Sequence, residues 1–119
     1  NLQKKGDEMD FCNLTGKEIV VWLPDNSVRT IPAQDTVASI EGELSEVKYS
    51  DGVRIRSIKL GTYVKNLPFP RIDTIYIVNP DILSNVSFRE DVVAVDEDTV
   101  VTDPQGKQLG YRGFKKLIK

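Results

Sequence analysis

The sequence predicts an α+β fold that is mainly β, built either as a small twisted barrel or as paired antiparallel sheets, with one short helix. Three observations support this class. The chain of 119 residues, 39% of them hydrophobic, is long enough for one core and too short for two ordinary domains. About seven to nine short runs rich in β-branched and aromatic residues are separated by turn residues. Only one segment, directly after the run Thr-Ile-Tyr-Ile-Val at residues 74–78, begins like a helix.

The first predicted strands form a hairpin. Residues 18–23 are β-branched and aromatic, and Pro-Asp-Asn-Ser at 24–27 suits a turn into a second strand at 28–31. Residues 36–40 and 43–49 then alternate apolar and polar positions, as half-buried strands do.

A turn at residues 50–52 leads into a strand at 53–60. Its apolar residues change from odd to even positions near Arg56, which predicts a bulge or bend there. Two prolines in residues 66–70 lack amide hydrogens, so this segment should cross over the domain as a stiff, extended connection. The nearly continuous apolar run 74–78 predicts a strand that is covered on both faces or flanked by the following helix.

The predicted helix starts at Asn79 and Pro80. Asn accepts hydrogen bonds from free amides at the N-cap position, and Pro fits the first helical position. The apolar residues that follow fall on one face, and the helix should end near Ser87. Strands at 92–95 and 99–102, a turn at 103–106 and a returning strand at 108–114 complete the domain.

We expect residues 12–119 to form this single domain and residues 1–11 to be a disordered or loosely attached segment. Residues 4–9 can be encoded by a purine-rich stretch that resembles a bacterial ribosome-binding site before a start codon. We therefore hypothesise that Met9 is the native start, which a mass measurement of protein made from the native gene would test.

Composition narrows the function classes. The net charge of -2 provides no overall basic field, so general nucleic-acid binding is disfavoured. The absence of histidine removes conventional Ser-His and Cys-His pairs, and Cys12, the only cysteine, is expected in the core. No metal site and no cofactor are predicted. No apolar run is long enough to span a membrane, and we expect a cytoplasmic protein, in the host cytosol if it is phage-encoded.

The predicted helix and its two ends are the best candidate site. Asn79 places a polar side chain beside free backbone amides, which can receive an anion, although Asp81 competes for the same field. Arg89 follows Phe88 and could clamp a phosphate or carboxylate, with Asp91 orienting it. Each feature has a structural alternative, namely an ordinary capped helix and an internal ion pair between Arg89 and Asp91.

Two further groups of residues could form part of a site. Tyr76 and Arg112 could line a pocket, whereas Tyr76 could equally lie in the core with its hydroxyl bonded at the edge. Glu90 and Asp91 could act as catalytic acid and base or as metal ligands, but adjacent residues usually point to opposite faces.

Several motifs match in order and spacing over most of residues 12–114: Asn13-Leu-Thr15, Ile31-Pro32, Val37-Ala38, Leu67-Pro68, Thr74-Ile-Tyr-Ile-Val78, Arg89 with Asp91-Val-Val93, and Arg112-Gly113-Phe114. With them the chain resembles a family of small uncharacterised proteins of phages, prophages and bacteria. The resemblance implies an origin more than a function. The chain departs from the family pattern at Asn79, where Ser is common, and at Val95 and Asp96, where an Ala-Pro pair is usual.

The leading hypothesis is a non-enzymatic phage-type accessory protein that forms a homo-oligomer and binds a small anionic or nucleotide-type ligand, such as a nucleotide-derived immune signal that it sequesters. In this hypothesis the arginines hold phosphates, aromatic rings stack on a base, and polar groups read its edges. The residues expected to do so are Arg89, Arg112, Tyr76, Phe88, Asn79 and Asp91. The alternative is a structural or protein-interaction module, a virion component or host-protein inhibitor, with a flat apolar patch instead of a pocket. An enzyme ranks third.

Overall fold

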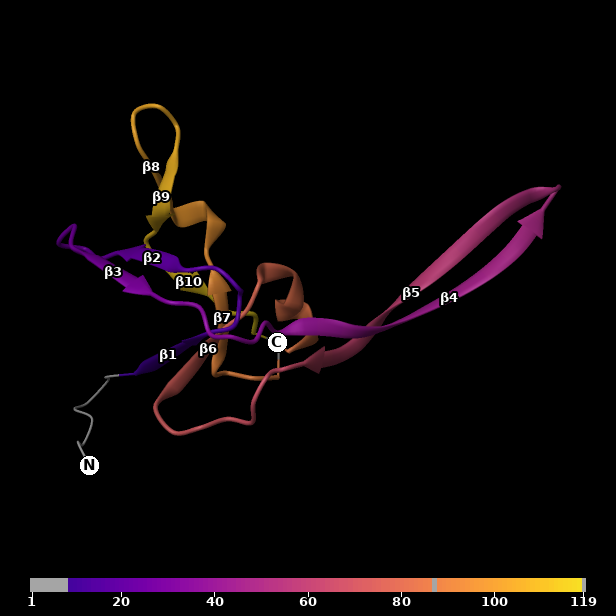
Figure 1. Ribbon diagram of the computed structural model, residues 1–119, viewed down its shortest axis with the longest axis horizontal. Helices are drawn as coiled ribbons and strands as arrows, with labels where there is room; N and C mark the ends of the chain where they lie inside the picture. Colours follow the sequence, from indigo (N-terminus) through magenta and orange to yellow (C-terminus); the bar gives the residue numbers. More distant parts are fainter. Residues whose placement is uncertain (1–8, 87, 119) are drawn as a thin grey trace.

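The structure, a computed structural model, describes residues 9–86 and 88–118, and of residues 41–44 and 59–62 it describes the backbone only. The chain is mostly strands, arranged in three small sheets (Figure 1). None of the described sheets closes into a barrel. The mainly β prediction is therefore confirmed, but the sheets are not simply antiparallel, because two of them contain parallel strand pairs.

The first sheet has the order β1-β6-β7-β10, formed by β1 (Asp10–Asn13), β6 (Thr74–Ile77), β7 (Val92–Val95) and β10 (Phe114–Lys115). β6 pairs in parallel with both β1 and β7, whereas β10 pairs with β7 in the antiparallel direction. The sheet is mixed because the long connection at residues 78–91 crosses over and brings β7 beside β6 in parallel, whereas β10 enters antiparallel to β7.

The second sheet has the order β3-β2-β9-β8, formed by β3 (Val28–Ile31), β2 (Ile19–Trp22), β9 (Gln108–Tyr111) and β8 (Val100–Thr102). The predicted hairpin between β2 and β3 is present. β9 joins β2 in parallel, so the C-terminal hairpin of β8 and β9 completes a sheet that began near the N-terminus.

The third sheet is a long hairpin of β4 (Ser39–Ser50) and β5 (Val53–Lys65), which we call the arm. Asp51 and Gly52 both have positive φ, 55° and 82°, which a tight hairpin turn of this twist requires. The arm projects away from the other two sheets (Figure 1) and gives the molecule a longest extent of 63 Å. The radius of gyration of the molecule is 18.4 Å, compared with about 13 Å for a compact domain of this length.

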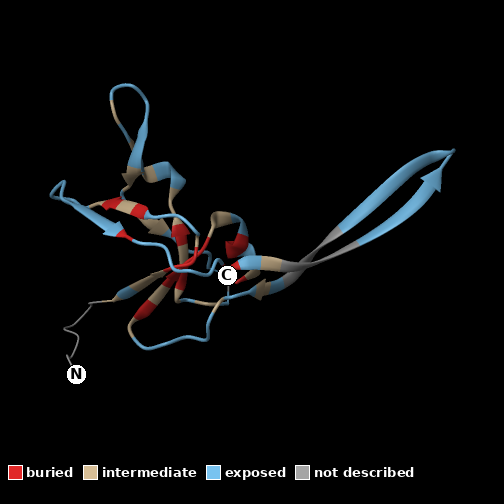
Figure 2. Ribbon diagram, viewed as in Figure 1, coloured by how far each residue is buried: buried red, intermediate tan, exposed pale blue. Residues whose placement is uncertain are grey.

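The predicted bulge near Arg56 is wrong in position. Arg56 and Ser57 pair regularly with Val47 and Glu46, and the register shifts instead between Glu41 and Glu43, nearer the base of the arm. The alternation of apolar residues could not locate the bulge because the outer part of the arm has no buried face (Figure 2).

The core lies on both sides of β6. Tyr76 and Val78 belong to a cluster with Leu14, Val92 and the short helix, whereas Ile77 faces a second cluster built mainly from β2 and β3. Buried residues gather along these central strands in Figure 2. The prediction that the run 74–78 is covered on both faces is confirmed.

The helix after β6 is a 3₁₀-helix, η1 (Pro80–Asn85), and a second one, η2 (Glu97–Thr99), precedes β8. Pro80 occupies the first helical position as predicted. Asn79 is the N-cap residue, but its side chain makes no capping hydrogen bond, contrary to prediction. The expected end at Ser87 lies outside the described residues.

The domain begins earlier than residue 12. Asp10 and Phe11, assigned from sequence to the loosely attached segment, form β1 and pair with Thr74 and Ile75. The Phe11 ring also stacks on Phe114, with 5.8 Å between the ring centroids. Residues 1–8 lie outside the described part of the chain, and the start at Met9 stays a prediction.

Candidate functional site

Tyr76 is the centre around which the candidate site is built. Its ring is fully buried on β6, and its hydroxyl donates to the carbonyl oxygen of Phe69 at 3.1 Å. The same hydroxyl accepts from Nε of Arg71 at 2.9 Å. The guanidinium carbons of Arg71 and Arg89 each lie 5.8 Å from the ring centroid. Tyr76 therefore occupies the core and orients two cations, and with no exposed surface its ring has no face for a ligand base.

Arg89 and Asp91 form a bidentate ion pair just before β7 in the chain. Nε of Arg89 lies 2.8 Å from Oδ1 of Asp91, and Nη2 lies 2.9 Å from Oδ2. Nη2 also donates to the carbonyl oxygen of Pro68 at 3.0 Å. Only 12% and 19% of the two side chains are exposed. The geometry corresponds to the structural alternative, an internal ion pair, which here also fastens the crossover to the sheet.

The ion pair shifts the pKa values of both of its groups. The hydrogen bonds from Arg89 hold the pKa of Asp91 below its ordinary value, and burial opposes this only in part. The same bonds raise the pKa of Arg89. The positive charge of Arg89 is thus already matched by a carboxylate, so it has little attraction left for an anionic ligand.

A hollow of about 610 Å³ nevertheless lies beside Arg89. Its walls come from the base of β5, the crossover and the segment after η1, and its exposed rings are Tyr63, Phe69 and Phe88. We call it the aromatic groove. Phe88 is exposed there, but the walls are mainly apolar and the one cation among the described residues that line the groove, Arg89, is paired with Asp91.

Asn79 and Arg112 lie away from this groove. Asn79 lines a separate hollow of about 290 Å³ with Lys17 and Tyr111 among others. The Arg112 side chain contacts the turn after β2, where Nη2 donates to Oδ1 of Asn26 at 3.2 Å. The six residues predicted from sequence therefore do not form one site: Arg89 lies against Asp91 and Tyr76, Phe88 lines the groove, and the other two are elsewhere.

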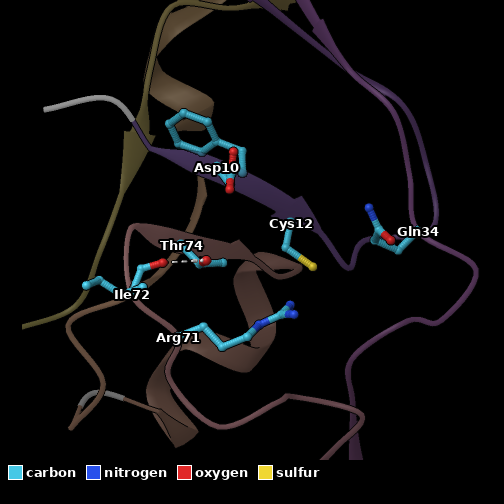
Figure 3. Close-up of a pocket in the computed structure, with 7 residues that line it drawn as sticks. Asp10, Cys12, Gln34, Arg71, Ile72 and Thr74 are labelled. Atoms are coloured by element: carbon cyan, nitrogen blue, oxygen red, sulfur yellow. Dashed lines mark hydrogen bonds between the residues drawn. The ribbon is translucent and has the colours of Figure 1, made fainter. Parts of the chain in front are cut away.

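Sequence reasoning missed a second cation, Arg71, which lines a cavity of about 480 Å³ between the start of β1, the loop after β3 and the end of the crossover (Figure 3). We call it the Arg71 pocket; its walls are Asp10, Phe11, Cys12, Gln34, Arg71, Ile72 and Thr74. In Figure 3 the guanidinium points toward the Cys12 thiol, with the Gln34 amide on the facing loop. Within the described chain, neither Nη atom of Arg71 has a hydrogen-bond partner.

The Cys12 thiol does not neutralise the positive charge of Arg71. Burial raises the pKa of Cys12, and the nearby Arg71 opposes that rise only in part, so the thiol is protonated at neutral pH. The hydrogen bond with Tyr76 raises the pKa of Arg71, and Asp10 contributes more weakly from the same pocket. Arg71 thus carries its full charge beside a neutral thiol and an amide, with the Asp10 carboxylate as a weaker negative neighbour in the same pocket.

Only the parallel pairing of β1 with β6 brings these groups together. Cys12 is the register partner of Tyr76, and Arg71 reaches back to the same ring from the end of the crossover. The one available signal in the sequence is that Arg71 directly follows Pro70, at the stiff end of a connection that leads into a buried strand.

Comparisons with known proteins give no relative. No protein-family model, no curated protein and no solved structure matches the chain. The resemblance to the phage and bacterial family therefore stays a prediction. Among the described residues, no three acidic, cysteine or histidine side chains gather as metal ligands would. No described helix is long and apolar enough to cross a membrane.

Proposed function

We propose that the protein is a non-enzymatic accessory protein that binds a small anionic ligand of the nucleotide-derived class, and that the ligand's phosphate binds Arg71. The observation that carries the proposal is an oriented guanidinium beside a cavity of about 480 Å³, whose two Nη atoms have no hydrogen-bond partner among the described residues. Pockets for small molecules range from about 300 to 1,000 Å³.

Charge favours Arg71 over Arg89 as the phosphate contact. Arg89 is held by both oxygens of Asp91, whereas Arg71 uses only Nε, in its bond to Tyr76. The free Nη1 and Nη2 edge has the fork geometry that suits two oxygens of one phosphate or carboxylate. Because its hydrogen bond to Tyr76 orients the exposed Arg71 side chain, binding would cost less conformational entropy than at an exposed arginine without such a bond.

The remaining walls fit the rest of such a ligand. The Phe11 ring is already stacked on Phe114 and lies under the Arg29 guanidinium, so the exposed apolar surface of the pocket comes from Ile72. Gln34 provides donor and acceptor groups for the polar edge of the ligand. Asp10 also lines the pocket, so the ligand should place its negative charge on the Arg71 side.

Calorimetry tests the proposal with cyclic nucleotides, cyclic ADP-ribose isomers and inorganic phosphate as probes. We expect binding of at least one nucleotide probe, and we expect Arg71→Gln to weaken it by about tenfold or more, since a charge-assisted bond contributes roughly 1.5–3 kcal/mol. Arg54→Gln, a matched exposed arginine on the arm, should leave the affinity unchanged. No heat with any probe, or equal affinity in Arg71→Gln, would contradict the proposal.

Cys12 offers an independent readout because it is the only thiol in the chain. An anion bound at Arg71 cancels the field that favours the Cys12 thiolate and also covers the pocket. A bound ligand should therefore slow alkylation of Cys12 in the wild type and have no effect in Arg71→Gln. Potassium chloride at equal ionic strength is the control. An equal slowing in both proteins would show that the ligand binds elsewhere.

A second candidate function, a protein-interaction module, is favoured by the exposed apolar side chains of the crossover. Phe69 is 89% exposed and Ile72 is 90% exposed, although Arg89 and Tyr76 fix the backbone that carries them. A rigid display of large apolar groups is typical of a contact surface for a partner. A pull-down should then recover a stoichiometric protein that Phe69→Ser releases, and its absence would leave the ligand-binding function alone.

A further inference from the structure

The arm presents two strand edges that have no partner. β4 and β5 pair only with each other in the described chain, and the arm extends away from both other sheets (Figure 1). A two-stranded hairpin is at best marginally stable in water, and an open edge is a template for another strand. Exposed apolar residues on the arm, Val47, Tyr49, Val53, Ile55 and Ile58, add to this requirement for a partner.

We propose that the arm pairs with the arm of a second copy of this chain, β4 against β4 in the antiparallel direction, with Val47 on the two-fold axis. The two hairpins then form one four-stranded sheet in the order β5-β4-β4-β5. This inference does not depend on the ligand proposed above, because the arm does not contribute to the Arg71 pocket.

Charge complementarity favours a second copy of the chain as the partner and Val47 as the centre of the paired strands. When Val47 faces Val47 of the second copy, Glu46 of each chain lies opposite Lys48 of the other. Cross-strand pairs of opposite charge stabilise a sheet, and like charges directly opposite destabilise it. Centring the pair on Glu46 would oppose two glutamates, and centring it on Lys48 would oppose two lysines. A two-fold axis at Val47 places opposite charges face to face on both sides, so the strand is complementary to a second copy of itself.

The monomer has these two side chains available for the exchange. Nζ of Lys48 lies 3.0 Å from Oε1 of Glu46 in the same strand, where both point to one face of the arm. They are 81% and 66% exposed, so their present contact contributes little to folding. In the dimer each would exchange this neighbour for the equivalent group across the interface.

The other edge of the arm does not have this symmetry. Pairing β5 with β5 about Ile55 would place Arg54 opposite Arg56 twice, and like charges would repel. The β4 edge is thus the one that favours a symmetric contact. The free extension of the arm leaves room for it, because the two globular parts would lie at opposite ends of the joined sheet.

Sedimentation equilibrium and native mass spectrometry of the full chain test the inference. We expect a concentration-dependent dimer in the wild type. Glu46→Lys and Lys48→Glu each replace two attractive cross-strand pairs by repulsive ones and should weaken dimerisation by about tenfold or more. The double variant Glu46→Lys with Lys48→Glu restores complementarity and should restore the dimer. A wild type that is monomeric at every concentration, or single variants that dimerise normally, would overturn the inference.

A cross-linking experiment locates the axis. In a Cys12→Ser background, Val47→Cys should form an intermolecular disulfide on oxidation, because facing Cα atoms in antiparallel strands lie about 4.5–5.5 Å apart, within disulfide range. Ile55→Cys, on the neighbouring strand, should remain a monomer on a non-reducing gel. Efficient cross-linking at residue 55 and none at residue 47 would show that the arms pair through β5 and would overturn the proposed edge.

Discussion

Replacing Arg89 by Gln should destabilise the fold, because this guanidinium fastens the crossover to β7. The change removes two charge-assisted hydrogen bonds to Asp91 and one to the carbonyl oxygen of Pro68. It also leaves the Asp91 carboxylate, of which 19% is exposed, without its counter-charge. The substitution should therefore lower the free energy of unfolding, whether or not a ligand binds nearby.

The expected cost follows from how far the pair is buried. Removing one partner of a fully buried ion pair costs about 3–5 kcal/mol. The Arg89 and Asp91 side chains retain 12% and 19% of their exposure, so water can partly replace the lost partner and the low end applies, about 3 kcal/mol. With an unfolding entropy of about 2.1 cal/mol/K per residue, this corresponds to a fall in Tm of roughly 12 °C for a chain of this length.

Urea denaturation and calorimetry measure this cost, and pH identifies its origin. Arg89 lowers the pKa of Asp91 in the folded state. Such a group stabilises the fold at pH values above its unfolded pKa of about 3.9, and this contribution is lost as the pH falls through the folded pKa. The difference between wild type and Arg89→Gln should therefore be largest near neutrality and shrink below about pH 4.

Two outcomes would refute this reasoning. A loss of less than about 0.5 kcal/mol at pH 7 would show that the ion pair does not secure the crossover. A large loss that stays constant down to pH 2 would mean that packing, not the charge of Asp91, is responsible. Arg54→Gln on the exposed arm is the matched control and should change stability by no more than about 0.5 kcal/mol.

Three other substitutions test the framework. Tyr76→Phe removes a buried hydroxyl with two hydrogen bonds and should cost about 1–3 kcal/mol by urea denaturation while also weakening nucleotide binding, since Arg71 loses its support. Asn13→Ala removes a fully buried amide that makes four hydrogen bonds to nearby groups and should cost about 2–4 kcal/mol by the same assay. Gly110→Ala places a methyl group 2.5 Å from the carbonyl oxygen of Val20 at a φ of 154°, so Tm should fall clearly by calorimetry, whereas Gly113→Ala, with open space around it, should not.

The candidate site shows where sequence reasoning succeeds. The pairing of Arg89 with Asp91 is local, two residues apart, so it could be foreseen as one of two alternatives. The choice between an internal pair and a ligand clamp could not, because it depends on how close the crossover at Pro68 comes to β7. Arg71 was missed for a related reason: its partner Tyr76 is close in sequence, but the walls of its pocket come from β1 and the loop after β3.

Elements that follow short-range rules could be predicted from the sequence. The run 74–78 is almost entirely apolar and is covered on both faces, Pro80 begins a helix, and Asp51 with Gly52 turns the chain sharply. Each of these depends on side-chain volume, ring closure or backbone freedom within a few residues.

Which strands pair with one another could be known only from the three-dimensional structure. The parallel pairing of β1 with β6 joins segments about sixty residues apart and creates the Arg71 pocket, and the arm leaves the core although its sequence alternates like that of a half-buried strand. Strand alternation records a preference for one covered face and does not specify what covers it. That choice depends on long-range packing, and for the arm we infer that the open β4 edge pairs with the same edge of a second molecule.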